Sequence, residues 1–384
     1  MRPLIFAAAI LTLTTSLAAA PAPSEELQAN PPVALDATRP VDLVIVLDTS
    51  GSMENLLDSA RARVWDIVNE LGRMTPQPEL RVGLVSFGSP EVATEEDGFV
   101  AVRSDLTSDL DQLYGALMAL STNGGEEKVG YALQAAVEKM SWSPDPEGLR
   151  LVFIAGNESA DQGVEQVDFR LVAEDARRAD ILINALYAGA RETAVSEKWP
   201  EIARAGGGNF SAIDTSIDLA QIATPHDQEL LRLNALLNET YLPYGESGEA
   251  GLANQRVQDN NATRLGVQSC SSRVVAKGSA LYDNSAWDLV DAALKEEFQW
   301  SSLRDSDLPE VLRPLTHDQR VAHVMGLRAE REKLQESIRE TSDTRELFLR
   351  KLRKDTAEGM GLDEALRSSL IAQAGEKGFS CEGC

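Results

Sequence analysis

An α/β fold built around a doubly wound, mostly parallel sheet of six strands is predicted by two features of the sequence. Short apolar runs of the kind that forms buried parallel strands recur up to about residue 215, and the first of them covers 42–47. Stretches with helical patterning separate most of these runs. Strands and helices that alternate in this way form a sheet with helices on both faces, and ligands bind at the carboxyl ends of its strands.

The expected elements of the sheet follow one another in chain order. The apolar runs that we interpret as strands cover 42–47, 80–87, 99–103, 149–155, 181–187 and 209–213. Helices are expected from just after residue 52 to about residue 73, and then at 107–120, 129–140, 168–178 and 196–205. Thr107 or Ser108 is the expected cap of the helix that begins there.

The chain from residue 216 to residue 384 has a different character and is expected to form a helical or irregular extension. Helices are predicted at 216–240, 286–298 and 362–376, whereas the polar stretch 243–285 shows no clear period and is expected to be irregular. The highly charged stretch 316–355 is most simply a solvated helix or helical hairpin packed on the body. A coiled-coil segment that binds a partner is the alternative.

Aromatic residues and cysteines of the extension each allow more than one interpretation. Five aromatic residues fall in or near the irregular stretch and are expected to form a small core, with a peptide or glycan pocket as the alternative. They are Tyr241, Tyr244, Tyr282, Trp287 and Trp300. Cys381 and Cys384 form a C-x-x-C pair, for which we expect a disulfide, either within the pair or to Cys270. A redox pair and half of a zinc site are the alternatives.

Composition narrows the classes of partner and of activity. The 384 residues include 61 acidic and 36 basic ones, for a formal net charge of −25. This balance argues against nucleic acid or anionic lipid as the main partner, because both select basic surfaces, and it is compatible with cations or basic proteins. The sequence contains no H-E-x-x-H, P-loop, G-x-S-x-G or G-x-G-x-x-G motif. We therefore expect a binding protein and no enzyme.

The N-terminus has the pattern of an export signal. Arg2 precedes an apolar stretch from Leu4 to Ala20, and small residues end it. We expect residues 1–20 to be a signal peptide, cleaved near Ala18, and residues 21–39 to be a linker; a retained membrane anchor is the alternative. No later stretch approaches 18 apolar residues, so the mature protein is expected to be periplasmic or secreted, without a stable membrane span.

The motif Asp48-x-Ser50-x-Ser52 stands at the end of the first expected strand. Three short oxygen side chains are thereby gathered where a strand ends and a helix begins, and such oxygens are the ligands that Mg²⁺, Ca²⁺ and Mn²⁺ prefer. Gly51 allows a tight turn between the two serines. The alternative interpretation is an ordinary helix cap, with Asp48 or Ser50 accepting hydrogen bonds from free amides.

In its motif and its order of elements, the segment 40–215 resembles the von Willebrand factor type A (VWA) domain. The resemblance rests on the first strand with its Asp48-Thr-Ser-Gly-Ser-Met53 sequence and on the α/β alternation that follows. It implies strand order 3-2-1-4-5-6 with an antiparallel third strand. It also implies a metal-ion-dependent adhesion site (MIDAS), in which two serines, a threonine from a second loop and an aspartate at the end of the fourth strand surround a divalent ion. One coordination position there stays open for an acidic group of a protein ligand.

Two MIDAS positions depart from the family pattern. The second loop reads Gly124-Gly-Glu-Glu-Lys128, so Glu127 stands at the position of the ligand threonine. The fourth strand is followed by Ala155-Gly-Asn-Glu158, so Gly156 stands at the position of the aspartate. In one interpretation the site is kept with its charge rearranged, and Asp48, Ser50, Ser52 and Glu127 hold the cation. In the other the site is a relic that binds no metal.

Three hypotheses for the function follow. The first is an exported protein that binds an unknown protein partner through a divalent cation, Mg²⁺ or alternatively Ca²⁺ or Mn²⁺, at the loops 48–52, 124–127 and 156–158. The second is a structural or scaffold component of the cell envelope with a metal-free MIDAS. The third, least favoured, is an enzyme whose active site lies within 216–384.

Overall fold

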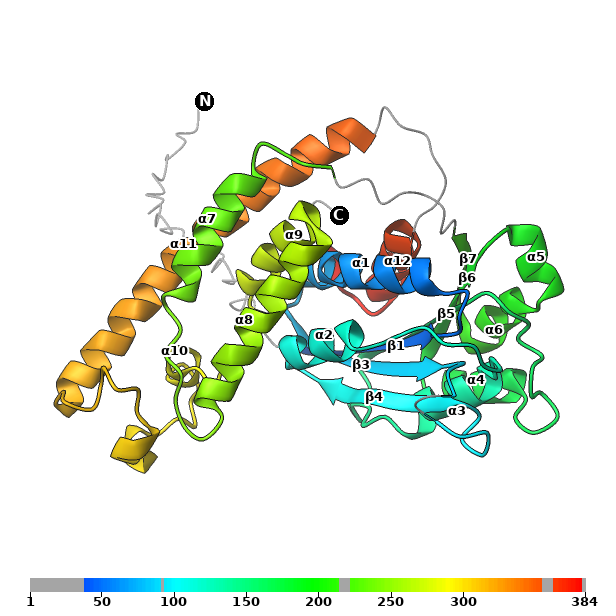
Figure 1. Ribbon diagram of the computed structural model, residues 1–384, viewed down its shortest axis with the longest axis horizontal. Helices are drawn as coiled ribbons and strands as arrows, with labels where there is room; N and C mark the ends of the chain where they lie inside the picture. Colours follow the sequence, from blue (N-terminus) through cyan, green and yellow to red (C-terminus); the bar gives the residue numbers. More distant parts are fainter. Residues whose placement is uncertain (1–37, 91–92, 214–221, 354–361, 382–384) are drawn as a thin grey trace, which may run out of the picture. The chain divides into compact units, whose positions relative to one another are not determined.

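The computed structural model describes residues 38–90, 93–213, 222–353 and 362–381 (Figure 1). The expected signal peptide and most of the linker lie outside the described residues. The central sheet has six strands in the order β4-β3-β1-β5-β6-β7, and all neighbouring strands are parallel except the antiparallel pair of β3 and β4. The predicted fold class and strand order are therefore confirmed. The strands of the sheet are β1 (Arg39–Asp48), β3 (Pro78–Phe87), β4 (Val100–Thr107), β5 (Leu149–Gly156), β6 (Leu182–Ala188) and β7 (Gly207–Ile213).

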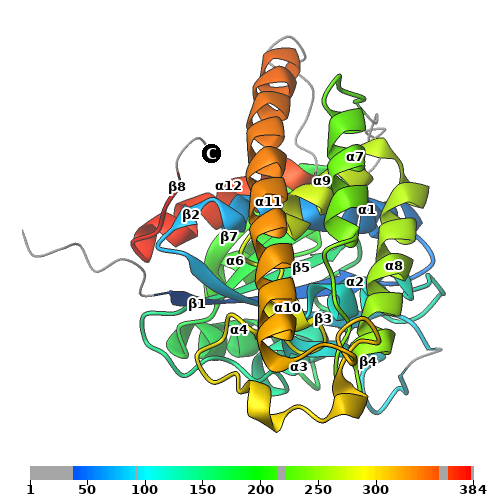
Figure 2. The same cartoon turned by 90° about the vertical axis from the view of Figure 1, so that its left-hand side faces the viewer.

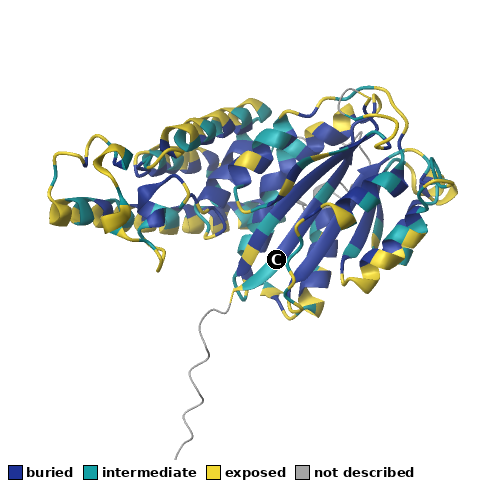
Figure 3. Ribbon diagram, turned by 90° about the horizontal axis from the view of Figure 1, so that it is seen from below, coloured by how far each residue is buried: buried dark blue, intermediate teal, exposed yellow. Residues whose placement is uncertain are grey.

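Both faces of the sheet are covered by helices, because alternate apolar side chains of the strands point to opposite sides. On β1, Leu43 and Leu47 join the core beneath α1, α2 and α12, while Val44 and Val46 join the core of α3, α4 and α6. Figure 3 shows the strands as the most deeply buried part of the chain. The covering helices are α1 (Glu54–Gly72), α2 (Leu110–Met118), α3 (Val129–Glu138), α4 (Phe169–Arg178), α5 (Arg191–Ser196), α6 (Trp199–Gly206) and α12 (Leu362–Glu376).

Two expectations about these helices need correction. The cap of α2 is Asp109, whose side chain accepts hydrogen bonds from the backbone amides of Asp111 and Gln112, and neither Thr107 nor Ser108 fills that place. The single helix expected at 196–205 is divided into α5 and α6. Lys198 has a left-handed backbone between them, and a proline in the first turn starts α6.

The extension contains more helix than its polar sequence predicted. The expectation of an irregular stretch at 243–285 is wrong, because α8 and α9 occupy most of it. The charged stretch 316–355 is confirmed as a helix, α11, and α7 packs beside it (Figure 2). The helices are α7 (Asp227–Asn238), α8 (Gly248–Leu265), α9 (Val267–Lys277), α10 (Leu289–Ala292) and α11 (His317–Arg353), with short 3₁₀ turns at Trp300–Ser302 and Asp305–Asp307.

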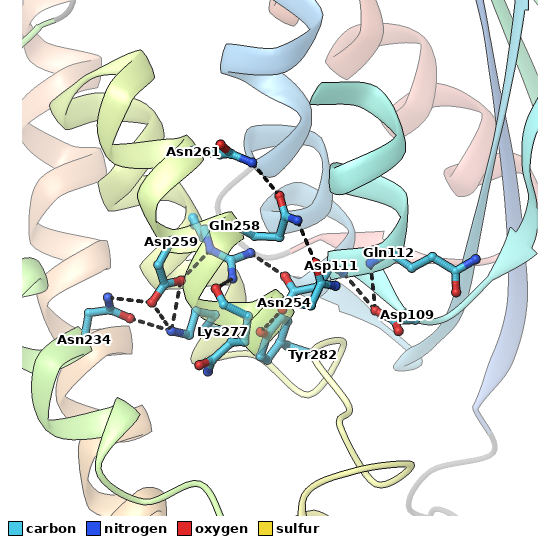
Figure 4. Close-up of polar contacts among 12 residues, drawn as sticks. Asp109, Asp111, Gln112, Asn234, Asn254, Gln258, Asp259, Asn261, Lys277 and Tyr282 are labelled. Carbon is cyan, nitrogen blue, oxygen red and sulfur yellow. Dashed lines mark hydrogen bonds and ion pairs between the residues drawn. The ribbon is translucent and has the colours of Figure 1, made fainter. Parts of the chain in front are cut away.

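A buried ion network explains why a polar stretch forms helices (Figure 4). Arg273 of α9 is 1% exposed, and its guanidinium donates to Asp111 of α2 and to Asp259 of α8, each at 2.6 Å. Lys277, one turn further on, is also buried and lies 2.9 Å from Asp259. Burial alone raises the pKa of Asp259, but the charges of Lys277 and Arg273 outweigh it and hold that pKa well below its usual range.

The same network ties the extension to the sheet domain. The hydroxyl of Tyr282 donates to Asp111 at 2.6 Å, and the guanidinium of Arg273 lies over the ring of Trp65 on α1. Residues 37–384 accordingly form one compact unit. The predicted division into 40–215 and 216–384 stays a prediction.

Helix α12 brings a distant part of the chain back to the sheet. It packs against α1, β6 and β7. The amides of Gln373 on α12 and Asn184 on β6 donate to each other at 2.8 and 2.9 Å, and both side chains are buried. Just beyond, β8 (Ser380–Cys381) pairs with the short β2 (Met74–Thr75).

The structure also shows where the aromatic residues and two of the cysteines of the extension lie. Tyr241, Tyr282 and Trp287 are buried in the core, as the simpler interpretation expected. Cys381 is disulfide-bonded, while Cys270 is a buried free thiol, so the alternative link to Cys270 is not made. In the described ranges, no helix has the length and apolar character needed to cross a membrane.

Replacing Arg273 by methionine is expected to lower the free energy of unfolding by about 3–5 kcal/mol, because Asp111 and Asp259 are then left buried without their guanidinium partner. Urea unfolding of the full chain measures this change. The matched control is Arg232→Met, which breaks an exposed pair with Glu229 and should leave the free energy of unfolding nearly unchanged. Equal losses in the two variants would contradict the account of the network.

Candidate functional site

The loop after β1 holds its shape through contacts with both neighbouring loops. Asp48 is 1% exposed, and its Oδ1 accepts a hydrogen bond of 2.7 Å from the backbone amide of Ser50. The hydroxyl of Thr49 donates to the carbonyl of Phe87 at the end of β3. The backbone amide of Asn123 donates to the carbonyl of Thr49, which joins the loop before α3 to the end of β1. The carboxyl ends of β1 and β3 and the loop before α3 therefore meet at one place.

The serines of the motif point to a common spot and do not cap the helix. The N-cap of α1 is Met53, and no side chain caps it, so the alternative of a helix cap formed by Ser50 is wrong. The hydroxyl oxygens of Ser50 and Ser52 lie 3.3 Å apart. Ser50 is buried and Ser52 is exposed, so the pair leads from the interior to the surface.

Glu127 enters the same spot from the loop before α3. Its side chain is buried, and its backbone amide donates to the side-chain oxygen of Gln162 at 2.9 Å. The Glu127 and Asp48 carboxyl groups lie close enough to interact directly with each other and with Ser50. The structure thus brings together all four residues that the sequence singled out as metal ligands: Asp48, Ser50, Ser52 and Glu127. Their role toward a metal stays a prediction.

Two glycines make room for this pair of carboxyl groups. Gly88 has φ +81°, and a Cβ there would lie 2.9 Å from Oδ1 of Asp48 and 3.1 Å from Cγ of Glu127. A Cβ at Gly156 would lie 3.1 Å from Oδ2 of Asp48 and 3.1 Å from the ring of Trp199. A side chain at position 156, where the family pattern has an aspartate, would therefore require the indole of Trp199 or the carboxyl group of Asp48 to shift by a few tenths of an ångström.

Each of the two carboxyl groups has one buried oxygen that lacks a hydrogen-bond donor. Neither Oδ2 of Asp48 nor Oε2 of Glu127 accepts a hydrogen bond from a donor group of the described residues. A buried carboxylate without such a partner is strongly destabilised. A shared proton or a cation can hold two such groups side by side, and both solutions fit the buried positions of these oxygens.

Without a cation, the two carboxyl groups keep their protons at pH values well above the usual pKa range of carboxylic acids. Burial raises the pKa of Asp48 to about 6, although hydrogen bonds from Ser50 oppose the rise. Burial, and next the charge of Asp48, raise the pKa of Glu127 to about 8. At neutral pH the metal-free pair therefore holds a proton, chiefly on Glu127.

The donor set suits a hard divalent cation. It consists of oxygens alone, from the carboxyl groups of Asp48 and Glu127 and the hydroxyl groups of Ser50 and Ser52, and such ligands favour Mg²⁺, Ca²⁺ or Mn²⁺. When both are ionised, the two carboxylates match the charge of the ion. The described residues contain no group of three or more His, Cys, Asp or Glu side chains that could hold a metal, so a cation here would depend on the hydroxyl groups as well.

Two residues of the site were not predicted from the sequence. The side-chain amide of Asn157, just after β5, contacts the hydroxyl of Ser52: its nitrogen lies 3.1 Å and its oxygen 3.3 Å from that hydroxyl oxygen. Gln162 fixes the backbone of Glu127. The position of Asn157, directly after Gly156 at the end of a strand, was the available signal, whereas nothing in the sequence pattern pointed to Gln162.

Comparisons with known proteins find similarities over the part of the chain that forms the sheet. Residues 42–225 match the model of the von Willebrand factor type A domain family. The solved VWA domain of SpRpn10 is 15% identical with a TM-score of 0.36, and the match covers 46% of this chain and 90% of that one. No curated protein sequence matches the chain.

Two longer solved proteins are also similar over the same part of the chain. Proximal thread matrix protein 1 from the mussel byssus, with a zinc-occupied MIDAS motif, is 17% identical with a TM-score of 0.37, and the match covers 48% of this chain and 44% of that one. The pilus adhesin SpaC from Lactobacillus rhamnosus GG is 15% identical with a TM-score of 0.35, and the match covers 47% of this chain and 28% of that one. The match thus spans less than half the length of each of these proteins.

In the presence of a chelator, the free energy of unfolding is expected to fall as the pH rises from about 5 to about 8. The folded state then holds protons on Asp48 and Glu127 that the unfolded chain has released, and their stabilising effect is lost as pH rises through the folded pKa values, about 6 and about 8. Glu127→Gln removes one titrating group. The free energy of unfolding of this variant should therefore fall by about 1 kcal/mol or more less than that of the wild-type protein over the same pH range.

Urea unfolding at several pH values measures this slope. Glu138→Gln, at an exposed position of α3, is the control and should leave the slope of the wild-type protein unchanged. A slope that is the same in Glu127→Gln and in the wild-type protein would show that Glu127 titrates as an ordinary glutamate.

Proposed function

We propose that this chain is a binding protein whose von Willebrand factor type A domain, matched over residues 42–225, holds a divalent cation at Asp48, Ser50, Ser52 and Glu127. Domains of this family generally mediate contacts between proteins. The observation that carries the proposal is that Asp48 and Glu127 each have a buried carboxyl oxygen without a hydrogen-bond donor, close to the hydroxyl groups of Ser50 and Ser52.

Each ligand has a distinct part in the proposed site. Asp48 holds the turn through the amide of Ser50 and offers its second oxygen toward the cation. Ser50 and Ser52 offer hydroxyl oxygens, and Glu127 supplies the second negative charge in place of the missing aspartate. A bound cation would neutralise the carboxylates and fix the loops that carry them. The cation would then organise the surface that a protein partner contacts.

A second candidate is favoured by the raised pKa of Glu127. In this alternative the two carboxyl groups share a proton and bind no metal, and the chain is a scaffold component of the cell envelope. The two proposals differ in whether the proton is displaced when a divalent cation is added. A cation that binds the pair must release it, whereas a metal-free site keeps it at neutral pH.

Titration of the chelator-treated full chain with Mg²⁺, Mn²⁺ and Ca²⁺ is expected to release heat and to raise the melting temperature for at least one of these ions. Asp48→Asn and Glu127→Gln should each weaken binding about tenfold or more, because each removes one of the two negative ligands. Asp58→Asn, an exposed position on α1, is the control and should bind as the wild-type protein does. No heat and no change in melting temperature with any of the three ions would leave the metal-free scaffold.

We also propose that the protein is exported, from the charged start and apolar stretch of residues 1–20. The mature chain is then expected in the periplasm or outside the cell. N-terminal sequencing of the protein recovered from these fractions should find a start near residue 19, and recovery of the intact N-terminus in a membrane fraction would instead support an uncleaved anchor.

A further inference from the structure

Exposed carboxylates stand on the loops at the edge of the sheet that holds the candidate cation site. They come from the loops at the carboxyl ends of the strands: the loop between β3 and β4, the loop before α3, the loop after β5 and the start of α5. We call them the acidic rim, and its members are Glu95, Glu96, Asp97, Glu126, Glu158, Glu165 and Glu192. Gly88 and Gly156, at the starts of two of these loops, lie against Asp48. Asp48 and Glu127 are more than nine-tenths buried, and each has one oxygen without a hydrogen-bond partner.

The basic side chains of the same loops are largely engaged. Lys128 pairs with Glu126 at 3.2 Å and lies over the ring of Phe99. The guanidinium of Arg191 lies over the ring of Phe210. Lys198 is the remaining basic side chain among the described residues of these loops. The carboxylates of the rim therefore outnumber the cations that could offset them.

A bound cation would not reverse this balance. A divalent ion carries two positive charges, and the ionised carboxylates of Asp48 and Glu127 carry two negative ones, so the filled site is neutral. The rim then sets the sign of the potential over this face. The pKa of the Tyr187 phenol is raised first by burial and then by the charges of Glu197, Glu158 and Glu127, of which Glu158 belongs to the rim.

We propose that the partner of this face is a protein segment rich in lysine and arginine, which contacts the acidic rim on both sides of the cation site. This inference rests on the proposed function for the position of the contact, and it goes further by assigning the charge of the partner. An acidic segment would be repelled by the like charges of several loops. A basic segment would be attracted to them within about one Debye length, and it could still present a single acidic side chain to the ion.

The test uses two labelled synthetic peptides of equal length, each with one central glutamate. Lysines flank the glutamate in one peptide, and glutamates flank it in the other. Fluorescence anisotropy with the full chain at physiological salt and with Mg²⁺ should show about tenfold or tighter binding of the lysine-flanked peptide, and added salt should reduce the difference. Equal affinity, tighter binding of the glutamate-flanked peptide, or no binding of either one would overturn the inference.

Two matched variants locate the contact. The rim variant changes four exposed carboxylates and should lose most of the preference for lysine; it combines Glu95→Gln, Glu96→Gln, Glu158→Gln and Glu192→Gln. The control variant removes the same charge from exposed positions of the extension and should keep the preference; it combines Glu296→Gln, Glu310→Gln, Glu330→Gln and Glu340→Gln. Equal losses in the two variants would mean that the peptide responds to the net charge of −25 and not to this face.

Repeating the measurement with a chelator separates this inference from the proposed function. If the lysine preference depends on the rim but no metal binds, the partner assignment stands and the cation site fails. If calorimetry detects metal binding at Asp48 and Glu127 but neither peptide is preferred, the cation site stands and the partner assignment fails.

Discussion

Two neighbouring buried carboxyl groups, each with one oxygen that lacks a hydrogen-bond donor, form the constraint on which the site depends. Asp48 and Glu127 reach this arrangement because the carboxyl ends of β1 and β3 and the loop before α3 meet, and because Gly88 and Gly156 carry no side chains there. Such a pair holds either a proton or a cation. The raised pKa values describe the protonated pair, and the hydroxyl groups nearby supply further oxygens for a cation.

The extension stabilises the domain that carries the site. Arg273 enters between Asp111 of the sheet domain and Asp259 of α8, and α12 closes over β6 and β7 through the amide pair of Gln373 and Asn184. The long polar part of the chain is therefore packed against the sheet and its helices through buried polar contacts. Buried ion pairs of this kind cost much when one partner is lost, which makes the extension inseparable from the fold that positions the loops.

The parts that could be predicted from the sequence are those with a local pattern. The apolar runs predicted the sheet, and the motif from Asp48 to Ser52 predicted where its polar site lies. The helices α8 and α9 could not be predicted, because Arg273 and its partners are buried as ion pairs and so break the apolar period on which a helix prediction depends. Asn157 and the indole of Trp199 were missed because only the fold brings them to the end of β1.

The most direct test of the central claim is a crystal structure of the protein soaked with Mn²⁺, with the ion located by its anomalous scattering. The account predicts one peak in contact with oxygens of both Asp48 and Glu127 and near the hydroxyl groups of Ser50 and Ser52. A structure without a peak at this place, in which Glu127 and Asp48 are joined by a short hydrogen bond, would contradict it and leave the proton as the bridge.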